Sequence, residues 1–140
     1  MAVAIDLSSF EKALNSLDRA ILRAREAPGD EELRDAVIQR FEYTYELAWK
    51  SLKRVLEEAA ASSEEIDYLS FNDLIRRGAE SGMIQDPQEW FAFRQSRNIT
   101  SHVYNEKKAI SVYASALRFA KAARILLSRL RDWQRDRADT

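Results

Sequence analysis

The only histidine of this chain lies in a segment whose residue types suit phosphate chemistry. His102 follows Arg97 by five residues and precedes Tyr104 by two, within the segment RNITSHVY. Histidine takes and gives protons near neutral pH, and the planar guanidinium of arginine binds phosphate oxygens through two parallel hydrogen bonds. Such a pair could cleave RNA without a metal, with His102 transferring a proton and Arg97 stabilising the developing charge. A lone histidine near a helix end is, however, more often a solvated or capping residue.

Arg97 and His102 cannot share a face of one continuous helix. Five residues advance a helix by one full turn and about 140° more. The two side chains can therefore meet only if the helix ends between them or if two chains contribute to one site. Asn98, which follows Arg97, could orient either group, although an asparagine near a helix end often serves as a cap.

The rest of the sequence lacks the usual signatures of enzymes. It has no glycine-rich phosphate loop, no nucleophile elbow, no histidine-rich metal motif and no cysteine. We therefore expect neither a metal nor a cofactor. No export signal and no apolar stretch of about 20 residues occurs, so we expect a soluble chain without membrane contact, with the cytoplasm as the default location.

The overall charge argues against a protein that coats nucleic acid. The chain has 22 Lys and Arg against 23 Asp and Glu, a net charge of −1. Any contact with RNA must therefore be local. The cations that could make a cleft locally positive are Arg76, Arg77, Arg94, Lys107 and Lys108. The alternative is that these residues belong to an ordinary solvated surface.

Helical periodicity dominates the sequence, which contains only three glycines and two prolines. We expect a single all-α domain, residues 1–140, folded as an antiparallel bundle of four to five helices. The second helix is the longest, and residues 61–65 are expected to connect it to the third. The residues after Trp133 are expected to fray. The expected helices span about residues 6–26 or 8–26, 30–60, 70–82, 86 to at least 97, and 105–133. Leu22 is expected on the apolar side of the first helix. The apolar face expected for the last helix consists of Ile110, Tyr113, Leu117, Ala120, Ile125, Leu127 and Leu130.

The long second helix contains two carboxylates one turn apart, Glu42 and Glu46. They could form an acid–base pair, but Glu46 and Lys50 also form an ordinary Glu-to-Lys helix pair, which favours a solvated face. The aromatic residues of the same helix, Phe41, Tyr43, Tyr45 and Trp49, could stack bases. Phe41 and Tyr45, however, follow its apolar stripe and are expected in the core. Tyr43 and Trp49 point elsewhere and are assigned to an interface.

Two blocks of the sequence resemble HepT-type HEPN proteins. The spacing Arg, four residues, His, one residue, Tyr is the motif of that family and falls here on Arg97, His102 and Tyr104. Residues 41–50, FEYTYELAWK, resemble the family's long second helix, and residues 73–98 follow its spacing. The similarity covers roughly residues 10–130. One departure is Asn105-Glu106, where members often carry Asp-Glu.

The resemblance implies a HEPN-like fold and a homodimer in which two motifs face each other across the twofold axis. It implies a metal-independent toxin ribonuclease, with Arg97 on the scissile phosphate, His102 in proton transfer and Asn98 as a supporting residue. A small nucleotidyltransferase would be the cognate antitoxin and would neutralise the toxin by adenylylating Tyr104. The alternative for Tyr104 is a packing or hydrogen-bonding role. The alternative function is a non-catalytic substrate-binding subunit of a two-component nucleotidyltransferase.

Overall fold

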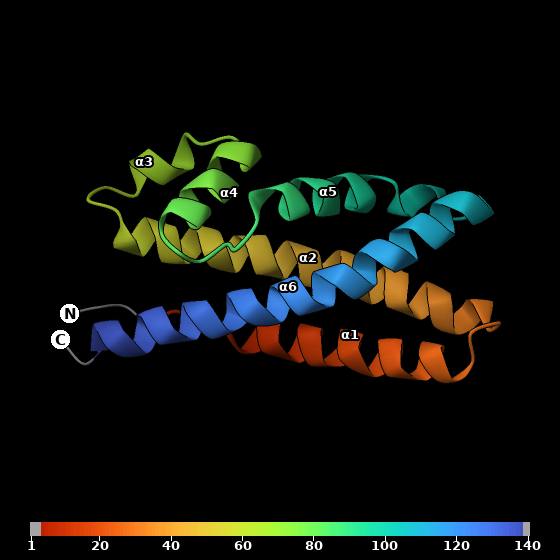
Figure 1. Cartoon of the computed structure of the whole chain (residues 1–140). Coiled ribbons are helices and arrows are strands. Elements are labelled where there is room, and N and C mark those ends of the chain that lie inside the picture. The colour runs from red at the N-terminus through yellow and green to blue at the C-terminus, as the bar shows by residue number, and fades with distance from the viewer. Residues whose placement is uncertain (1–3, 139–140) are drawn as a thin grey trace.

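The computed structural model describes residues 4–138, and these residues form six α-helices, one 3₁₀ helix and no strand. The all-α antiparallel bundle expected from the sequence is thereby confirmed. The elements are α1 (Ser8–Glu26), α2 (Glu31–Ala59), α3 (Glu64–Asp67), α4 (Phe71–Glu80), α5 (Pro87–Asn98), η1 (Thr100–His102) and α6 (Glu106–Ala138) (Figure 1).

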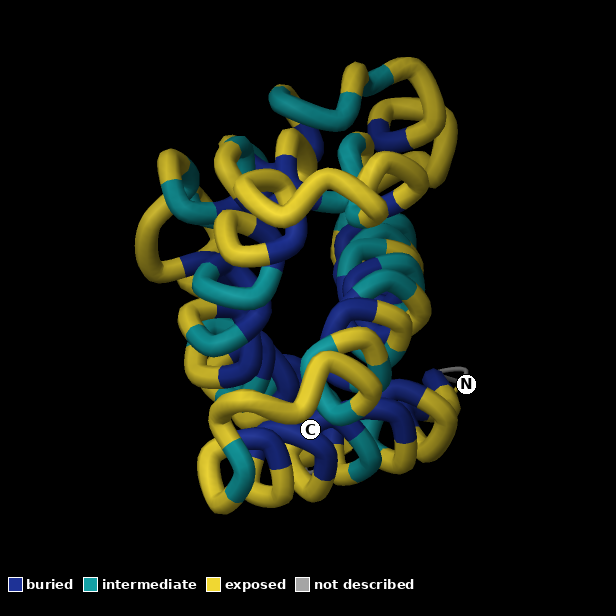
Figure 2. The backbone as a smooth tube through the Cα atoms, turned by 90° about the vertical axis from the view of Figure 1, so that its right-hand side faces the viewer, coloured by how far each residue is buried: buried dark blue, intermediate teal, exposed yellow. Residues whose placement is uncertain are grey.

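The helix α2 is the centre of the bundle and contacts every other element. α1 runs antiparallel to it on one side, α4 and α5 lie on the other side, and α6 crosses obliquely over the group (Figure 1). Figure 2 shows that the buried positions lie on the sides of the helices that face one another. A side chain on α5 can therefore reach α2 directly.

Local capping signals set the starts of four helices at the positions that the sequence predicts. In each case a side-chain oxygen accepts a hydrogen bond from a backbone N–H group in the first turn, which satisfies a donor that has no partner within the helix. The acceptors are Asp30 with Glu32 (2.9 Å), Ser70 with Asp73 (3.1 Å), Asp86 with Gln88 (3.0 Å) and Asn105 with Lys108 (3.2 Å).

Two expectations about irregular segments are wrong. The expected connection at residues 61–65 runs into α3, because Ile66 is buried, with 1% of its surface exposed, and draws this turn onto the bundle. The residues after Trp133 continue α6 to Ala138, and the expectation for residues 139–140 lies outside the described residues. Residues 134–138 stay helical because Gln134 hydrogen-bonds both the N–H (2.6 Å) and the C=O (2.9 Å) of Ile5, which ties the two ends of the described chain together.

The apolar face expected for α6 is confirmed only in part, with Ala120, Leu127 and Leu130 buried. Ile110 and Ile125 were expected on it but are 56% and 38% exposed, and Leu22 of α1 is 60% exposed. The oblique path of α6 sets which side of the helix faces the bundle (Figure 1). The buried face consists of Ala109, Val112, Ser115, Ala116, Phe119, Ala120, Ala123, Leu126, Leu127 and Leu130.

An aromatic cluster joins the three helices that position the candidate site. Phe119 of α6 is fully buried and meets the rings of Phe41 (5.2 Å between centroids) and Tyr45 (6.2 Å) on α2. It also meets Trp90 (5.7 Å) and Phe93 (5.4 Å) on α5. The expected core positions of Phe41 and Tyr45 are confirmed. Burial raises the pKa of the Tyr45 hydroxyl well above its usual range.

Thr44 provides a test of the energetics of this core. Its side chain is fully buried, and its hydroxyl has no hydrogen-bond partner among residues 4–138. Because an unpaired buried hydroxyl is unfavourable, Thr44→Val should raise the free energy of unfolding by about 1 kcal/mol, measured by urea denaturation. As a control, Ser115→Ala should lower the free energy of unfolding by about 1 kcal/mol, because this substitution removes the buried 2.6 Å hydrogen bond to Ser96. A less stable Thr44→Val chain would contradict this account.

Candidate functional site

The helix α5 ends between Arg97 and His102, as one of the two sequence-based alternatives requires. Its last residue is Asn98, and the 3₁₀ turn η1 follows at Thr100–His102. The Thr100 hydroxyl donates to the Arg97 carbonyl oxygen at 2.9 Å, and the His102 N–H donates to the Ile99 carbonyl oxygen at 2.9 Å. This tighter winding breaks the α-helical register and turns His102 onto a different face.

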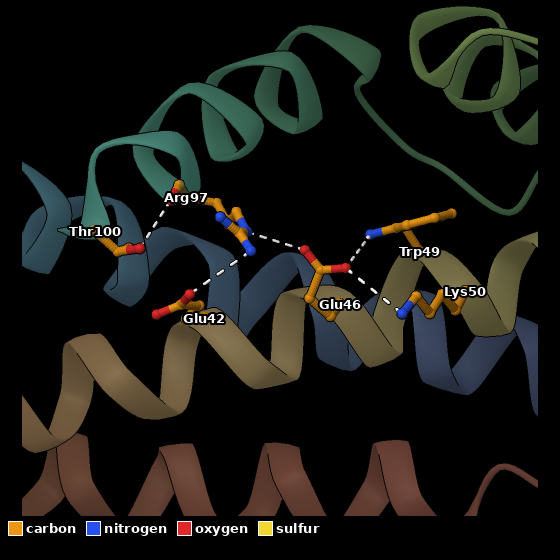
Figure 3. A network of polar contacts seen from close by, with 6 residues as sticks. All are labelled: Glu42, Glu46, Trp49, Lys50, Arg97 and Thr100. Atoms are coloured by element: carbon orange, nitrogen blue, oxygen red, sulfur yellow. Dashed lines mark hydrogen bonds and ion pairs between the residues drawn. The ribbon is translucent and has the colours of Figure 1, made fainter.

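Arg97 is held against α2 by two carboxylates (Figure 3). Its Nε lies 3.0 Å from Glu46 Oε1, and its Nη2 lies 3.7 Å from Glu42 Oε1. The second oxygen of Glu46 accepts a hydrogen bond from the Trp49 indole at 3.1 Å and lies 3.9 Å from Lys50 Nζ. Glu46 is thus fixed by three cationic or N–H groups, and it fixes the direction of the guanidinium.

This arrangement corrects the interpretation of the two glutamates. Neither an acid–base pair nor a purely solvated face describes them, because both flank the guanidinium of Arg97. The expected Glu46 and Lys50 pair is present as well. The sequence placed Glu42 and Glu46 on one face of α2, but nothing local identified their partner, which lies 51 residues after Glu46.

His102 and Tyr104 project from the turn that follows α5. Their rings lie 6.1 Å apart, edge to face at 71°, and both side chains are exposed, Tyr104 to 85%. Within this chain Tyr104 therefore does not pack into the core. Among residues 4–138, no hydrogen bond or ion pair joins His102 to Arg97. The helix end brings the two side chains to adjacent turns but leaves open space around the imidazole.

The five candidate RNA-contacting cations fall into two groups. Arg76 bonds to Asp73 at 2.9 Å, and Arg77 lies within 3.9 Å of Glu65 and Glu80, so their charges are locally compensated. Arg94, Lys107 and Lys108 are exposed, and none of them forms an ion pair with the part of the chain that the structure describes. The two lysines occupy the first turn of α6, shortly after Tyr104.

A cavity of about 390 Å³ opens beside Arg97 between α2, α4 and α5. Arg97 and Asn98 both line it, and Asn98 is exposed. Trp49, which the sequence assigned to an interface, lines this cavity half-buried, with its ring edge to face against Phe71 at 6.0 Å. Tyr43 is 40% exposed and hydrogen-bonds Ser16 at 2.9 Å.

Two further features of residues 4–138 bear on the chemistry. No group of three or more His, Asp or Glu side chains within this range is arranged to hold a metal ion. None of the helices in the same range is both long and apolar enough to cross a membrane.

The family model that matches residues 5–132 is described as nucleotidyltransferase substrate binding protein like. The chain belongs to this family. A curated Haemophilus influenzae protein named Probable ribonuclease HepT is 41% identical over 102 residues, which cover 73% of this chain and 68% of the relative. The resemblance of the sequence to HepT-type proteins is thereby confirmed.

Two solved structures of similar proteins agree with the fold. One is a Haemophilus influenzae protein described as having the fold of a substrate-binding domain of a nucleotidyltransferase. It aligns with a TM-score of 0.85 and 33% identity over 90% of this chain and 99% of that chain. The other, from Thermus thermophilus, aligns with a TM-score of 0.73 and 34% identity over 87% of this chain and 98% of that chain. The family's helical fold therefore extends over nearly the whole chain.

Proposed function

We propose that this chain is a HepT-like toxin ribonuclease of a toxin–antitoxin pair, which cleaves RNA without a metal at a site made by Arg97 and His102. The observation that carries the proposal is the helix end at Asn98, which places a carboxylate-fixed guanidinium and an exposed imidazole on the successive turns of α5 and η1. The 41% identity to a protein named as a probable ribonuclease supports the same activity. Asn98 is a supporting residue at this helix end.

The proposed reaction uses the 2′-hydroxyl of the RNA as the nucleophile. His102 removes the proton of this hydroxyl, the 2′-oxygen forms a bond to the adjacent phosphorus, and the bond from phosphorus to the 5′-oxygen breaks. The leaving 5′-oxygen takes a proton, so the products are a 2′,3′-cyclic phosphate and a 5′-hydroxyl. Glu46 holds Nε of Arg97 and Glu42 lies 3.7 Å from Nη2, so Nη1 is the guanidinium nitrogen that would donate to a phosphate oxygen.

A homodimer supplies the second proton-transferring group that this reaction needs. One imidazole cannot be base and acid in the same step, and His102 is the only histidine of the chain. A second copy with its own His102 across a twofold axis would provide the acid. The exposure of Asn98, His102 and Tyr104 leaves this surface available for such an interface. A second subunit more than about 15 Å from His102, far beyond hydrogen-bond reach, would contradict this arrangement.

We further propose that a cognate small nucleotidyltransferase neutralises the chain by adenylylating Tyr104. The Tyr104 oxygen would attack the α-phosphorus of ATP, the bond to the β-phosphate oxygen would break, and pyrophosphate and the hydroxyl proton would leave. The 85% exposure of Tyr104 and its 6.1 Å ring contact with His102 support this role. A phosphate with a bulky base at this position would exclude RNA by sterics and charge.

Tyr104→Phe should keep the fold and much of the nuclease activity but escape neutralisation, because phenylalanine lacks the oxygen that accepts the adenylyl group. Intact-mass measurement after incubation with the partner and ATP should show one or more adenylyl groups on the native chain and none on the variant. Tyr68→Phe, at a tyrosine that is 87% exposed on another turn, is the matched control and should be modified normally. An adduct that persists on the Tyr104→Phe chain would overturn the assignment.

A second candidate is a non-catalytic substrate-binding subunit of a two-component nucleotidyltransferase. It is favoured by the family description and by the Haemophilus influenzae fold described as a substrate-binding domain. Incubation of the isolated chain with single-stranded RNA and a chelator distinguishes the two. The ribonuclease should yield cyclic-phosphate ends and leave DNA of the same sequence intact, whereas the binding subunit should leave the RNA uncut.

A further inference from the structure

The cavity next to Arg97 combines aromatic walls with a cationic rim. Trp49 and Phe71 contribute aromatic surface, and Lys53, Arg94 and Arg97 contribute positive charge. Among residues 4–138, Glu46 is the only carboxylate that lines it, so the lining has an excess of positive charge in a chain whose net charge is −1. Apolar side chains from the segment around α3 also line it, among them Ile66 and Leu69.

The individual contacts show which cationic groups are available to a ligand. Lys53 lies 3.7 Å from Asp67, and Arg97 is paired with Glu46. Arg94 is exposed, its guanidinium lies 4.8 Å from the centroid of the Phe71 ring, and it forms no ion pair within the described range of the chain. A guanidinium plane next to an aromatic ring is a surface on which an unpaired base can stack.

The cavity is also in the right place for a nucleotide. Arg97 lines the cavity and, in the proposed function, binds the scissile phosphate, so the sugar and base attached to that phosphate lie at the cavity mouth. Asn98, the next residue, offers an amide that can donate to and accept from the edge of a base. The volume of about 390 Å³ falls within the range of small-molecule pockets, about 300 to 1,000 Å³.

We propose that this cavity binds one unpaired nucleobase of the RNA, adjacent to the phosphate held by Arg97. The inference rests on the proposed function and adds a base subsite to it. A base in a duplex is stacked and paired and cannot enter a cavity between helices, so the site selects single-stranded RNA. Trp49, Phe71 and Arg94 supply the stacking surfaces, and Asn98 contacts the base edge.

The indole of Trp49 reports directly on this cavity. Its N–H donates to Glu46 at 3.1 Å, so its NMR signal depends on the site, whereas Trp90 is buried in the core and Trp133 lies on α6. Two single-stranded RNA hexamers serve as probes. The first carries 2′-O-methyl groups and cannot be cleaved, because it lacks the 2′-hydroxyl nucleophile. The second has the same backbone with abasic sugars throughout. Trp49→Phe assigns the signal. The intact hexamer should shift the indole signal of Trp49 and leave the signals of Trp90 and Trp133 unchanged. The abasic hexamer should leave all three signals unchanged.

Two arginines in similar settings provide matched variants. Arg94 lies over Phe71 at 4.8 Å and lines the cavity, whereas Arg76 lies over Phe91 at 5.2 Å and does not. The native chain should bind the intact hexamer about 5- to 100-fold more tightly than the abasic one, the range expected for stacking of one base. Arg94→Ala should reduce this ratio severalfold, and Arg76→Ala should leave it unchanged.

The outcomes separate this inference from the proposed function, because cleavage is measured independently on unmodified RNA. A chain that cleaves RNA while its Trp49 signal stays unchanged, or responds equally to the abasic hexamer, has no base subsite here, and the inference is wrong. The absence of any hexamer binding overturns it as well. A shifted Trp49 signal in a chain that does not cleave RNA keeps the base subsite and rejects the ribonuclease.

Discussion

Arg97→Ala should slow RNA cleavage by about 100- to 1,000-fold, because the variant loses the cation that α2 fixes at the helix end. The chain should remain folded. Arg97 and its two glutamate partners are each about a third exposed, and ion pairs of this kind contribute only about 0 to 1 kcal/mol to stability. Initial cleavage rates and thermal unfolding of the same preparations measure both effects.

Two variants sharpen this prediction. Arg97→Lys keeps the charge but loses the planar pair of donors, so it should recover only part of the rate. Arg135→Ala removes an exposed arginine that pairs with Asp132 and Asp136 near the other end of α6, and it should cleave normally. A native rate in Arg97→Ala, or an equal loss in Arg135→Ala, would show that Arg97 has no specific role.

Phe119→Ala should lower the free energy of unfolding by about 3 to 5 kcal/mol, the usual cost of removing a fully buried phenylalanine. The effect is large because Phe119 contacts aromatic rings on both α2 and α5, which carry the two sides of the candidate site. Since a domain of this kind has only about 5 to 15 kcal/mol of stability, this loss is a large fraction of the total. Urea denaturation followed by circular dichroism measures the change.

The control is an apolar residue of the same helix that faces solvent. Ile110 is 56% exposed, so Ile110→Ala should change the free energy of unfolding by no more than about 0.5 kcal/mol. Similar losses in the two variants would contradict the observed orientation of α6 and favour the face expected from the sequence.

The parts of this fold that follow from neighbouring residues could be predicted from the sequence. The caps at Asp30 and Asp86 need only a short polar side chain followed by a helical turn, and Pro87 adds a fixed backbone angle. The break between Arg97 and His102 was one of two alternatives that followed from helix geometry alone. Such signals are local, so they do not depend on how the helices later pack.

The relations between distant segments could not be predicted in the same way. The pairing of Arg97 with Glu46 depends on the packing of α5 against α2, and the buried face of α6 depends on its oblique path (Figure 1). The short helix α3 forms because Ile66 is buried by packing. Residues 61–65, which precede Ile66, are all polar or small and do not indicate a helix. The cavity beside Arg97 likewise draws residues from several helices. The sequence singled out some of its lining residues, such as Trp49, Arg94 and Arg97, but could not bring them together.

In the proposed function, His102 transfers the proton during RNA cleavage without a metal. The most direct measurement is the cleavage rate of single-stranded RNA by native and His102→Ala chains in the presence of a chelator, with the ends of the products identified. The account predicts cyclic-phosphate products from the native chain and a rate at least about 100-fold lower for the variant, which should unfold at the same temperature because His102 is exposed. Equal rates for the two folded chains, or cleavage that the chelator abolishes, would contradict it.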